Sequence, residues 1–391
     1  MHNIQTNTQY IENNNNDDKL KSDEQVESQL QATRNLQQQI VKKPLQLSDD
    51  FQKVLFNTTE TEAYCLDGTP AGLYYKNGYG SGANKLVIHF QGGGWCFGLN
   101  DKELLESCHS RAYDKTFNAY GSSKTWQKHS NEAESYFCSN KENDKIFYNW
   151  NRIYLQYCDG SGHQGYKKEV QTYNGEKLYF KGINITMTQL KWVEQNYDIS
   201  QMDTFAVYGC SAGGLAVYTW LDHIKDRITK INPKIKFFGL ADSGIFPIYK
   251  NLQTNDNLYE NYMTKLYKFV NQESEFPEKK CRDYYQKLNQ DASQCFFAEN
   301  LIAFIDSPLY LMQSAYDSWA LGNVLGSTCS QNDNLNACNH IEKAQIHTFH
   351  NKYKQIYKNA TTLRNNRQVW MPSCVFHCAL GKWEYYWFNT E

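Results

Sequence analysis

The segment Asp203-Thr-Phe-Ala-Val-Tyr-Gly-Cys-Ser-Ala-Gly-Gly-Leu-Ala-Val-Tyr-Thr-Trp220 decides the fold, because it has the pattern of a strand, a sharp turn and a helix in succession. β-Branched and aromatic residues precede the turn, and an amphipathic run with helical spacing follows it as far as Ile228. A strained Gly-x-Ser-x-Gly turn exposes a serine at a helix N-terminus. The segment therefore predicts a nucleophile elbow with Ser211 at its tip. The alternative is a glycine-rich turn that is capped by a serine.

Four further β-like runs occur along the chain, and each is followed by a cluster of small or polar residues. Helical patterns lie between some of them, for example at residues 187–197. This alternation predicts an α/β fold with a mostly parallel central sheet flanked by helices. In such a sheet the active site gathers at the carboxyl ends of the strands. The four runs are residues 85–90, 152–157, 235–240 and 308–312.

The first 46 residues differ in composition from the rest of the chain. Asn, Gln, Asp, Lys and Ser dominate them, so they cannot bury enough apolar surface to offset the entropy of ordering. We predict a disordered N-terminal segment over residues 1–46 and a single catalytic domain over residues 47–391. The net charge of −2 gives no basic surface for nucleic acid, and no apolar run is long enough to cross a bilayer. We expect a monomer.

The chain has twelve cysteines without the paired spacing of a zinc site. Several lie in polar stretches typical of loops, which favours disulfide-bonded loops and an oxidising compartment. Glycosylation sequons begin at Asn57, Asn184 and Asn359, in agreement with a secretory route. The first residues, Met1-His-Asn-Ile-Gln-Thr, show no signal peptide. The cysteines and sequons thus predict a secreted or secretory-pathway protein, whereas the first residues do not. We predict no metal and no cofactor.

A serine hydroxyl becomes a strong nucleophile only when a base takes its proton, and the base needs a carboxylate to orient it. In α/β-hydrolases these residues follow the chain order Ser, Asp or Glu, His. Asp317 follows the run at 308–312, and His377 lies in Pro372-Ser-Cys-Val-Phe-His-Cys378. Two disulfides from the cysteines of that segment would hold the imidazole still. Spacing alone leaves rivals, which are Asp242 and Asp306 for the acid and His340, His347 and His350 for the base.

The segment Gln91-Gly-Gly-Gly-Trp-Cys96 follows a predicted strand. Bare glycine backbone allows N–H groups to reach the oxyanion of a tetrahedral intermediate. We predict an oxyanion hole formed by Gly93 and Gly94, together with Ala212 after the nucleophile. A phosphate-binding loop is the rival interpretation, but the Lys-Ser/Thr ending of a P-loop is missing.

Taken together, the motifs resemble those of the pectin acetylesterase and Notum family of serine hydrolases. The resemblance implies an α/β-hydrolase-like fold, a catalytic triad of Ser211, Asp317 and His377, and no metal. It covers roughly residues 60–388. The segments that carry it are Gln91-Gly-Gly-Gly-Trp-Cys96, Tyr157-Cys-Asp-Gly-Ser161, Gly209-Cys-Ser-Ala-Gly-Gly-Leu-Ala216, Leu240-Ala-Asp-Ser-Gly244, Ala315-Tyr-Asp-Ser-Trp319 and Ser373-Cys-Val-Phe-His-Cys378.

The resemblance implies two kinds of substrate. Plant-type members resemble deacetylases of cell-wall polysaccharide, and the animal Notum type removes a fatty acyl group from a protein. The glycine-rich segment is closer to the plant type, so we predict a carboxylic ester hydrolase that acts on acetylated, pectin-like polysaccharide. The alternatives are deacylation of a protein or lipid, and an inactive carbohydrate-binding or interaction protein on the same scaffold. We predict that Trp95, Asp159 and Trp319 bind the substrate.

Overall fold

The computed structural model describes residues 48, 50–114, 120–137, 144–271, 277–330 and 334–379. The predicted disordered segment, residues 1–46, lies outside them, so its disorder stays a prediction. Residues Gln46–Glu391 form one compact unit. Among the described residues, none of the helices combines the length and the apolar character that a membrane crossing requires.

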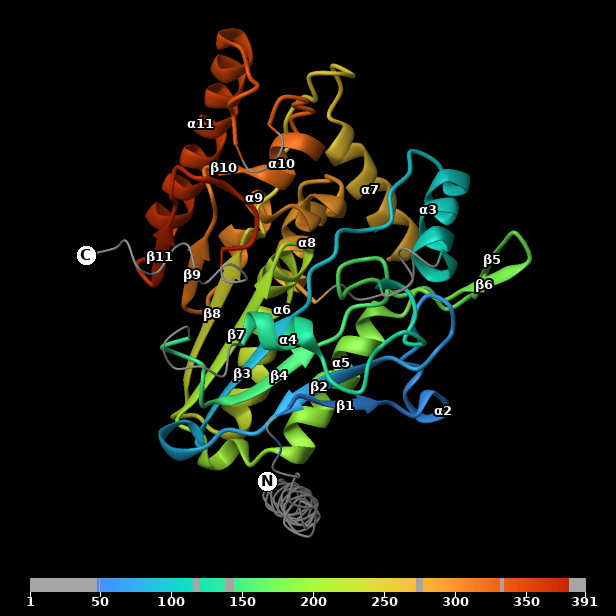
Figure 1. The fold of residues 1–391 in the computed structure, drawn as a ribbon, viewed down its shortest axis with the longest axis vertical. Coiled ribbons are helices and arrows are strands. Elements are labelled where there is room, and N and C mark those ends of the chain that lie inside the picture. Colours follow the sequence, from blue (N-terminus) through green and yellow to red (C-terminus); the bar gives the residue numbers. More distant parts are fainter. Residues whose placement is uncertain are drawn as a thin grey trace, which may run out of the picture. The chain divides into compact units, whose positions relative to one another are not determined.

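An eight-stranded sheet forms the centre of this unit, in the order β1-β2-β4-β3-β7-β8-β9-β11 (Figure 1). All pairs from β4 to β11 are parallel, whereas β2 pairs antiparallel with both β1 and β4. The predicted α/β fold with a mostly parallel sheet is therefore confirmed. The strands are β1 (Gln52–Leu55), β2 (Gly72–Lys76), β3 (Lys85–Phe90), β4 (Asn151–Leu155), β7 (Thr204–Cys210), β8 (Lys236–Asp242), β9 (Leu309–Met312) and β11 (Arg367–Trp370).

The central strands β3 and β7 are buried along almost their whole length, as expected for parallel strands that are covered on both faces. The sequence pattern ends the strand at Tyr208, but β7 continues to Cys210. This extension occurs because Gly209 and Cys210 pair with Ala241 and Asp242 of β8. Pairing with a neighbour overrides the weak strand preference of glycine, and it carries the backbone directly into the turn at Ser211.

Helices cover both faces of the sheet, with α5 (Gly182–Asn196) and α6 (Ala212–Ile231) behind it and α4 (Asn131–Tyr136) in front in Figure 1. The predicted helix at 187–197 corresponds to α5, which begins earlier, at Gly182, and ends at Asn196. Helix α6 packs on β3, β7 and β8, and it is buried from Ala212 to Asp222 because it is the central helix of the unit. The remaining helices are α2 (Thr58–Thr61), α3 (Asp101–Tyr113), α7 (Leu258–Val270), α8 (Lys279–Lys287), α9 (Ala298–Leu301), α10 (Ser318–Asn323) and α11 (His340–Leu363).

Two small sheets lie outside the central one. The hairpin β5 (Gln171–Tyr173) and β6 (Glu176–Leu178) contacts α3. The second sheet pairs β10 (Tyr316–Asp317) with β12 (Val375–Phe376) in parallel. This short pairing matters for function, because it places Asp317 opposite Phe376, the residue before His377.

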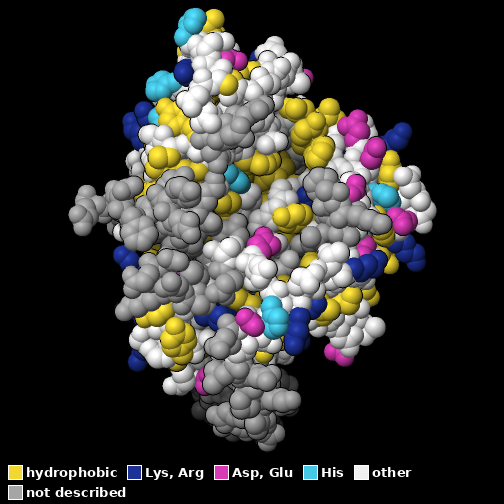
Figure 2. All heavy atoms as spheres, viewed as in Figure 1, with side chains coloured by type: hydrophobic (Ala, Val, Ile, Leu, Met, Phe, Trp, Pro, Cys, Tyr) yellow, Lys and Arg dark blue, Asp and Glu magenta, His cyan; other side chains and the backbone are white. Residues whose placement is uncertain are grey.

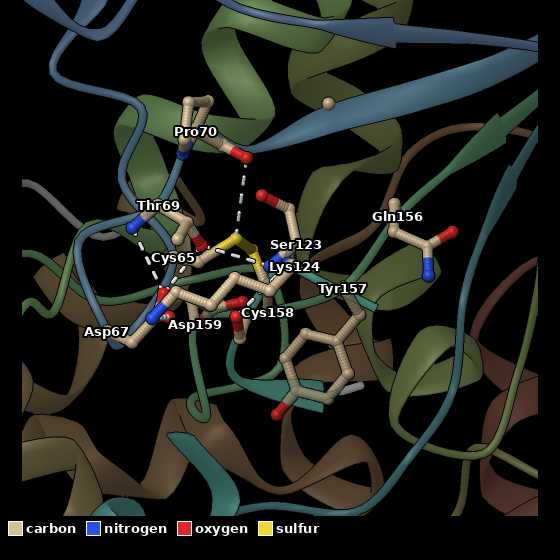
Figure 3. The surroundings of a disulfide bond; sticks show 12 residues. Cys65, Asp67, Thr69, Pro70, Ser123, Lys124, Gln156, Tyr157, Cys158 and Asp159 are labelled. Atoms are coloured by element: carbon tan, nitrogen blue, oxygen red, sulfur yellow. Dashed lines mark hydrogen bonds and ion pairs between the residues drawn. A yellow bond between two sulfur atoms is a disulfide. The ribbon is translucent and has the colours of Figure 1, made fainter. Parts of the chain in front are cut away.

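Disulfides tie several loops to other parts of the unit, as the predicted disulfide-bonded loops require. Figure 3 shows the Cys65–Cys158 bond, which joins the segment before β2 to the loop after β4 and lies beside the Asp67–Lys124 ion pair of 3.1 Å. Cys374 is exposed and forms no disulfide. The expectation of two disulfides at the His377 loop is therefore wrong, since Cys378 alone is bonded there. The five bonds among the described residues are Cys65–Cys158, Cys96–Cys108, Cys210–Cys378, Cys281–Cys295 and Cys329–Cys338.

Candidate active site

Ser211 occupies the sharp turn between β7 and α6, with φ 62° and ψ −126°. This backbone conformation is unfavourable for a residue with a side chain and costs about 1–3 kcal/mol. Hydrogen bonds hold it in place. The N–H of Ser211 donates to the carbonyl of Asp242 at 3.0 Å, and its carbonyl accepts from the N–H of Leu215 at 3.0 Å. The strand, turn and helix are thus arranged as the sequence predicts.

The glycines around the turn are required by close backbone contacts. A Cβ atom on Gly209 would overlap the carbonyl oxygen of Gly213, and one on Gly213 would overlap the carbonyl oxygen of Phe90 at the end of β3. No side chain fits at either place, because the obstructing atoms belong to the backbone. The turn therefore packs directly against the carboxyl end of β3.

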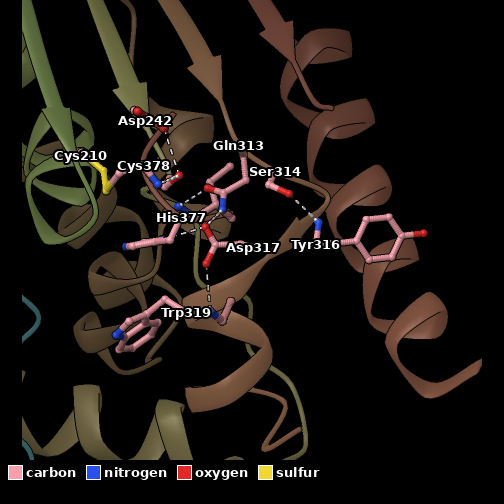
Figure 4. A network of polar contacts seen from close by, with 12 residues as sticks. Cys210, Asp242, Gln313, Ser314, Tyr316, Asp317, Trp319, His377 and Cys378 are labelled. Atoms are coloured by element: carbon pink, nitrogen blue, oxygen red, sulfur yellow. Dashed lines mark hydrogen bonds and ion pairs between the residues drawn. A yellow bond between two sulfur atoms is a disulfide. The ribbon is translucent and has the colours of Figure 1, made fainter. Parts of the chain in front are cut away.

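Asp317 and His377 form a hydrogen-bonded pair in which Nδ1 of His377 lies 2.8 Å from Oδ2 of Asp317 (Figure 4). The Asp317 side chain is fully buried, and that of His377 keeps 18% of its exposure. An ionised carboxylate only accepts hydrogen bonds, so Nδ1 carries the proton and Nε2 is the basic nitrogen. This is the orientation that a general base needs.

Two further donors hold the Asp317 carboxylate. The N–H of Ala320, in the first turn of α10, donates to Oδ1 at 2.9 Å, and the side-chain amide of Gln313 donates to Oδ2 at 3.0 Å. The Gln313 carbonyl oxygen in turn accepts from the N–H of Ile245 at 3.0 Å. Gln313 is 1% exposed. It therefore fixes the acid and at the same time ties the end of β9 to the loop after β8.

The Cys210–Cys378 disulfide brings the serine elbow and the histidine loop together. It joins the residue before Ser211 to the residue after His377, with their Cα atoms 5.7 Å apart. The N–H of Cys378 also donates to the hydroxyl of Ser243 at 3.0 Å. Ser243 directly follows Asp242, whose carbonyl accepts from the N–H of Ser211. Ser211 and His377 therefore lie on adjacent loops at the carboxyl ends of β7 and β8.

A ring nitrogen of His377 lies within 4.8 Å of both sulfurs of this disulfide. A group of one histidine and two cysteines has the composition of a metal site, but sulfurs joined to each other cannot act as thiolate ligands. The cluster is a brace for the histidine loop rather than a set of metal ligands.

The rival acids and bases lie in other surroundings. Asp306 precedes β9 at its amino end, where its carboxylate pairs with Lys280 and Arg364. The carboxylate of Asp242 accepts from the hydroxyl of Ser243 at 3.0 Å. The three rival histidines belong to α11, which begins at His340. There the ring of His350 stacks on Tyr316 at 4.8 Å and lies 5.5 Å from the ring of His347.

The glycine-rich segment lies against the serine. A Cβ atom on Gly92 would lie 2.6 Å from the carbonyl oxygen of Cys210 and 3.0 Å from Cβ of Ser211. Gly93 and Gly94 have φ values of 135° and 65°, which side chains disfavour. The loop can therefore follow the elbow closely.

Two side chains, the half-buried Arg111 and the buried Tyr157, fix the peptide planes of this loop. Arg111 donates to the carbonyl of Gly93 at 2.9 Å, and the Tyr157 hydroxyl donates to the carbonyl of Gly94 at 2.8 Å. The C=O and N–H of a trans peptide point in opposite directions, so the N–H groups of Gly94 and Trp95 point away from Arg111 and Tyr157. Within the described ranges, neither of these N–H groups donates to an acceptor.

The oxyanion hole of Gly93, Gly94 and Ala212 stays a prediction, and this geometry makes the N–H of Trp95 a further candidate donor. Ala212 is the first residue of α6, where helical N–H groups lack intrahelical acceptors. Sequence analysis missed Arg111 and Gln313 as supports of the site. Their roles depend on peptide orientation and on contacts across the fold, for which the sequence carries no pattern.

We expect Arg111→Met to lower kcat for p-nitrophenyl acetate by about 10- to 100-fold while KM changes little, because a misaligned oxyanion donor affects mainly the transition state. Besides its hydrogen bond, the guanidinium lies 5.5 Å and 5.4 Å from the ring centroids of Tyr120 and Tyr157. Steady-state kinetics with a melting curve would test this. Lys102→Met, on the exposed side of the same helix, is the control. An unchanged kcat in a folded Arg111→Met protein would contradict the prediction.

Trp95 and Trp319 belong to an aromatic cluster beside His377. Their ring centroids are 5.8 Å apart, and Trp319 lies 6.3 Å from the imidazole. Phe246 contacts both tryptophans and lies 6.1 Å from His377. A pocket of about 150 Å³ adjoins the cluster. Its lining residues are Trp95, Cys96, Phe97, Tyr259, Tyr262, Met263, Trp319 and Asn323.

Asp159 lies apart from this pocket, in the loop after β4. It is 1% exposed, and its carboxylate accepts from the backbone and the hydroxyl of Ser161 and from the N–H of His163 at 3.1 Å. Burial raises the pKa of Asp159 to about 6. His163 in turn contacts the carbonyl of Gln91 through Nε2 at 2.8 Å. These contacts hold the loop against the glycine-rich segment, and substrate binding by Asp159 stays a prediction.

Comparison with known proteins gives consistent results. A sequence profile of the pectinacetylesterase family matches residues 45–391. Pectin acetylesterase 5 of Arabidopsis thaliana is 26% identical over 353 residues, which cover 86% of this chain and 75% of that protein. Palmitoleoyl-protein carboxylesterase NOTUM of Schmidtea mediterranea is 26% identical over 348 residues, or 85% of this chain and 59% of that one. The crystal structure of the Wnt deacylase Notum from Drosophila aligns with a TM-score of 0.70 at 20% identity, covering 88% and 89% of the two chains.

The sheet, the flanking helices and this structural match define an α/β-hydrolase-like protein. The chain belongs to the pectinacetylesterase family, and it is a carboxylic ester hydrolase. The predicted family, fold class and enzyme class are therefore confirmed.

Proposed function

We propose that this protein hydrolyses acetyl esters through a triad of Ser211, His377 and Asp317. The observation that carries the proposal is the Cys210–Cys378 bond, because it links the elbow serine to a histidine whose Nδ1 contacts a buried carboxylate at 2.8 Å. This link supports a grouping of three side chains from distant parts of the sequence at one edge of the sheet, where parallel α/β proteins place their active sites.

In the proposed reaction, Nε2 of His377 takes the proton of the Ser211 hydroxyl as the serine oxygen attacks the ester carbonyl. The negative charge that develops on the carbonyl oxygen is stabilised by N–H groups of Gly93, Gly94 and Ala212, together with that of Trp95. The alcohol leaves with the proton from His377, and the acyl group stays on Ser211. Water then repeats the sequence and releases the acid, while Asp317 keeps the imidazole oriented throughout.

The size of the adjoining pocket favours a short acyl group. Pockets that enclose drug-sized ligands measure about 300–1,000 Å³, whereas the pocket beside Trp95 and Trp319 measures about 150 Å³. The aromatic cluster lies next to His377, with the rings of Phe246 and Trp319 6.1 Å and 6.3 Å from the imidazole. Acetylated polysaccharide is therefore our first substrate, and an acylated protein or lipid is the alternative.

The five disulfides favour folding in an oxidising compartment. We infer that the protein enters the secretory pathway and meets its substrate outside the cytosol. A polysaccharide substrate agrees with this location.

A series of p-nitrophenyl esters with acyl chains of two to sixteen carbons tests the proposal. We expect kcat/KM to be highest for acetate and to fall by at least tenfold at eight carbons, because the small pocket cannot bury the added methylenes. Ser211→Ala is the control for background hydrolysis. A maximum at eight or more carbons would support the deacylase alternative. Equal rates for wild type and Ser211→Ala would support the inactive scaffold.

A further inference from the structure

Gln91 begins the glycine-rich loop, directly after the last residue of β3. It is 2% exposed. Its N–H donates to the carbonyl of Leu155 at 3.1 Å, and its carbonyl contacts Nε2 of His163 at 2.8 Å. Its side-chain carbonyl accepts from the N–H of Tyr157 at 2.8 Å, and its side-chain amide donates to Oε2 of Glu132 at 2.7 Å. The start of the loop is therefore bonded to a carboxylate from α4.

Helix α4 lies away from the region in which the substrate pocket opens. Figure 2 shows hydrophobic side chains gathered between α7 and α10, which carry much of the lining of the pocket at Trp95 and Trp319. In the same view α4 lies well below this gathering (Figure 1). Glu132 is not among the residues that line the pocket. Its contact with the site is made through Gln91.

The Glu132 carboxylate accepts from neutral donors. Burial raises its pKa, and hydrogen bonds from Tyr154 and Gln91 offset part of this rise. The phenols of Tyr74 and Tyr120 also face it, and both stay uncharged at neutral pH, because the pKa of Tyr74 is raised to about 12 and that of Tyr120 is raised as well. Removing a carboxylate from water costs free energy, and perturbed carboxylates cluster at functional sites.

The chemistry of the partners fixes the orientation of the Gln91 amide. A backbone N–H can only donate, so that of Tyr157 requires the amide oxygen. An ionised carboxylate can only accept, so Glu132 requires the amide nitrogen. Tyr157 continues the chain of contacts, because its hydroxyl donates to the carbonyl of Gly94 at 2.8 Å. Through one glutamine, the carboxylate thus holds the start of the loop and the tyrosine that fixes its middle.

We propose that Glu132 is a positioning residue of the esterase site, which orders the glycine-rich loop through Gln91. The proposal rests on the esterase function above and adds a residue that contacts neither the substrate nor the reacting atoms. The carboxylate keeps the Gln91 amide in the orientation that the N–H of Tyr157 needs. Loss of this bond leaves the N–H groups of the loop less well aligned, which affects a developing oxyanion more than it affects substrate binding.

An exchange of the acid and the amide tests this role. Gln91→Glu puts a second carboxylate where an amide now donates to Glu132 at 2.7 Å. We expect kcat for p-nitrophenyl acetate to fall about 100-fold at pH 9, and less at pH 6, where a proton shared by the two carboxylates replaces the lost amide hydrogen. The double variant Gln91→Glu/Glu132→Gln again pairs one acid with one amide and leaves an acceptor for the N–H of Tyr157. It should return kcat to within about fivefold of wild type at both pH values.

Two readouts separate positioning from a purely structural role. In Gln91→Glu, KM should change less than about threefold, while Ki for methaneboronic acid rises in step with the loss of kcat, because its tetrahedral serine adduct places an oxygen at the oxyanion position. Glu132→Gln keeps an acceptor for the Gln91 amide but loses the charge. It should lower kcat about threefold to tenfold, and it decides the question if Gln91→Glu does not fold.

Asp144→Asn is the matched control. Asp144 is also a buried carboxylate, and it accepts from the N–H groups of Ile146 and Phe147 at 3.0 Å and 2.7 Å, before β4 begins. This variant should leave kcat within twofold, whatever its melting temperature. A folded Glu132→Gln protein with full kcat would overturn the proposal, as would an exchange variant as slow as Gln91→Glu or an unchanged Ki for methaneboronic acid. Failure of the wild type to hydrolyse p-nitrophenyl acetate would instead refute the esterase function itself.

Discussion

Replacing Ser211 with alanine is expected to lower kcat for p-nitrophenyl acetate by about 10⁵- to 10⁶-fold, because the acyl-enzyme route loses its nucleophile. His377→Ala should cost about as much, since the serine hydroxyl then has no base. Asp317→Asn should cost about 10⁴-fold, because an amide favours the wrong imidazole tautomer. Stopped-flow and long-time steady-state assays of purified proteins cover this range.

The double variant Ser211→Ala/His377→Ala gives the sharper result. Substitutions at residues that act as a unit have strongly non-additive effects on kcat, so the double variant should be no slower than either single variant. Asp306→Asn, a change in the rival acid far from His377, serves as the matched control and should leave kcat within twofold. Additive losses, or a Ser211→Ala enzyme within tenfold of wild type, would mean that the three residues do not form a catalytic unit.

Removing the Cys210–Cys378 bond is the second change with a large expected effect. The Cys210→Ala/Cys378→Ala variant should be less stable by about 5 kcal/mol in the chain-entropy model, because the bond closes a loop of 168 residues. For a unit of this size, the melting temperature should fall by roughly 7 °C. We also expect kcat to fall at least 100-fold at a temperature where the variant is folded, because the histidine loop is no longer tied to the elbow.

A matched disulfide variant separates the two effects. The Cys329–Cys338 bond closes a loop of nine residues and lies before α11, outside the site. Its removal should cost about half as much stability in the same model and leave kcat within twofold. Differential scanning fluorimetry and p-nitrophenyl acetate hydrolysis provide the two readouts. If both disulfide variants retained full kcat, the Cys210–Cys378 bond would be a stabilising link without a role in positioning His377.

Part of the site could be predicted because its signals are local. The turn at Ser211 has a length, a glycine pattern and flanking periodicities that follow from backbone sterics alone. The three glycines of the segment Gln91–Cys96 can be predicted in the same way, since glycine is needed where two chain segments approach closely. The parallel sheet follows from alternating strand and helix patterns. By contrast, β1, β2 and β11 were not predicted, because such short strands depend on their neighbours.

The supports of the site needed the structure. The expectation that both Cys374 and Cys378 brace the histidine was wrong, because pairing depends on which cysteine lies 5.7 Å from a partner, and Cys210 lies beside Cys378. Gln313 and Arg111 are polar residues without a motif. Gln313 bonds to the Asp317 carboxylate and to the N–H of Ile245, 4 and 68 residues away, and Arg111 bonds to the Gly93 carbonyl, 18 residues away. Spacing alone also left Asp317 and His377 among several rivals, and the short β10–β12 pairing brings them together.

The sequence by itself determined the elbow, the glycine-rich loop, the α/β architecture and the family, since each depends on residues close together in the chain or on the order of motifs along it. Tertiary structure decided which acid meets which histidine and where the N–H groups of the glycine-rich loop point. These features depend on hydrogen bonds, disulfides and side-chain packing between segments far apart in sequence. Distances across the fold fix such contacts, and local backbone preference does not encode them.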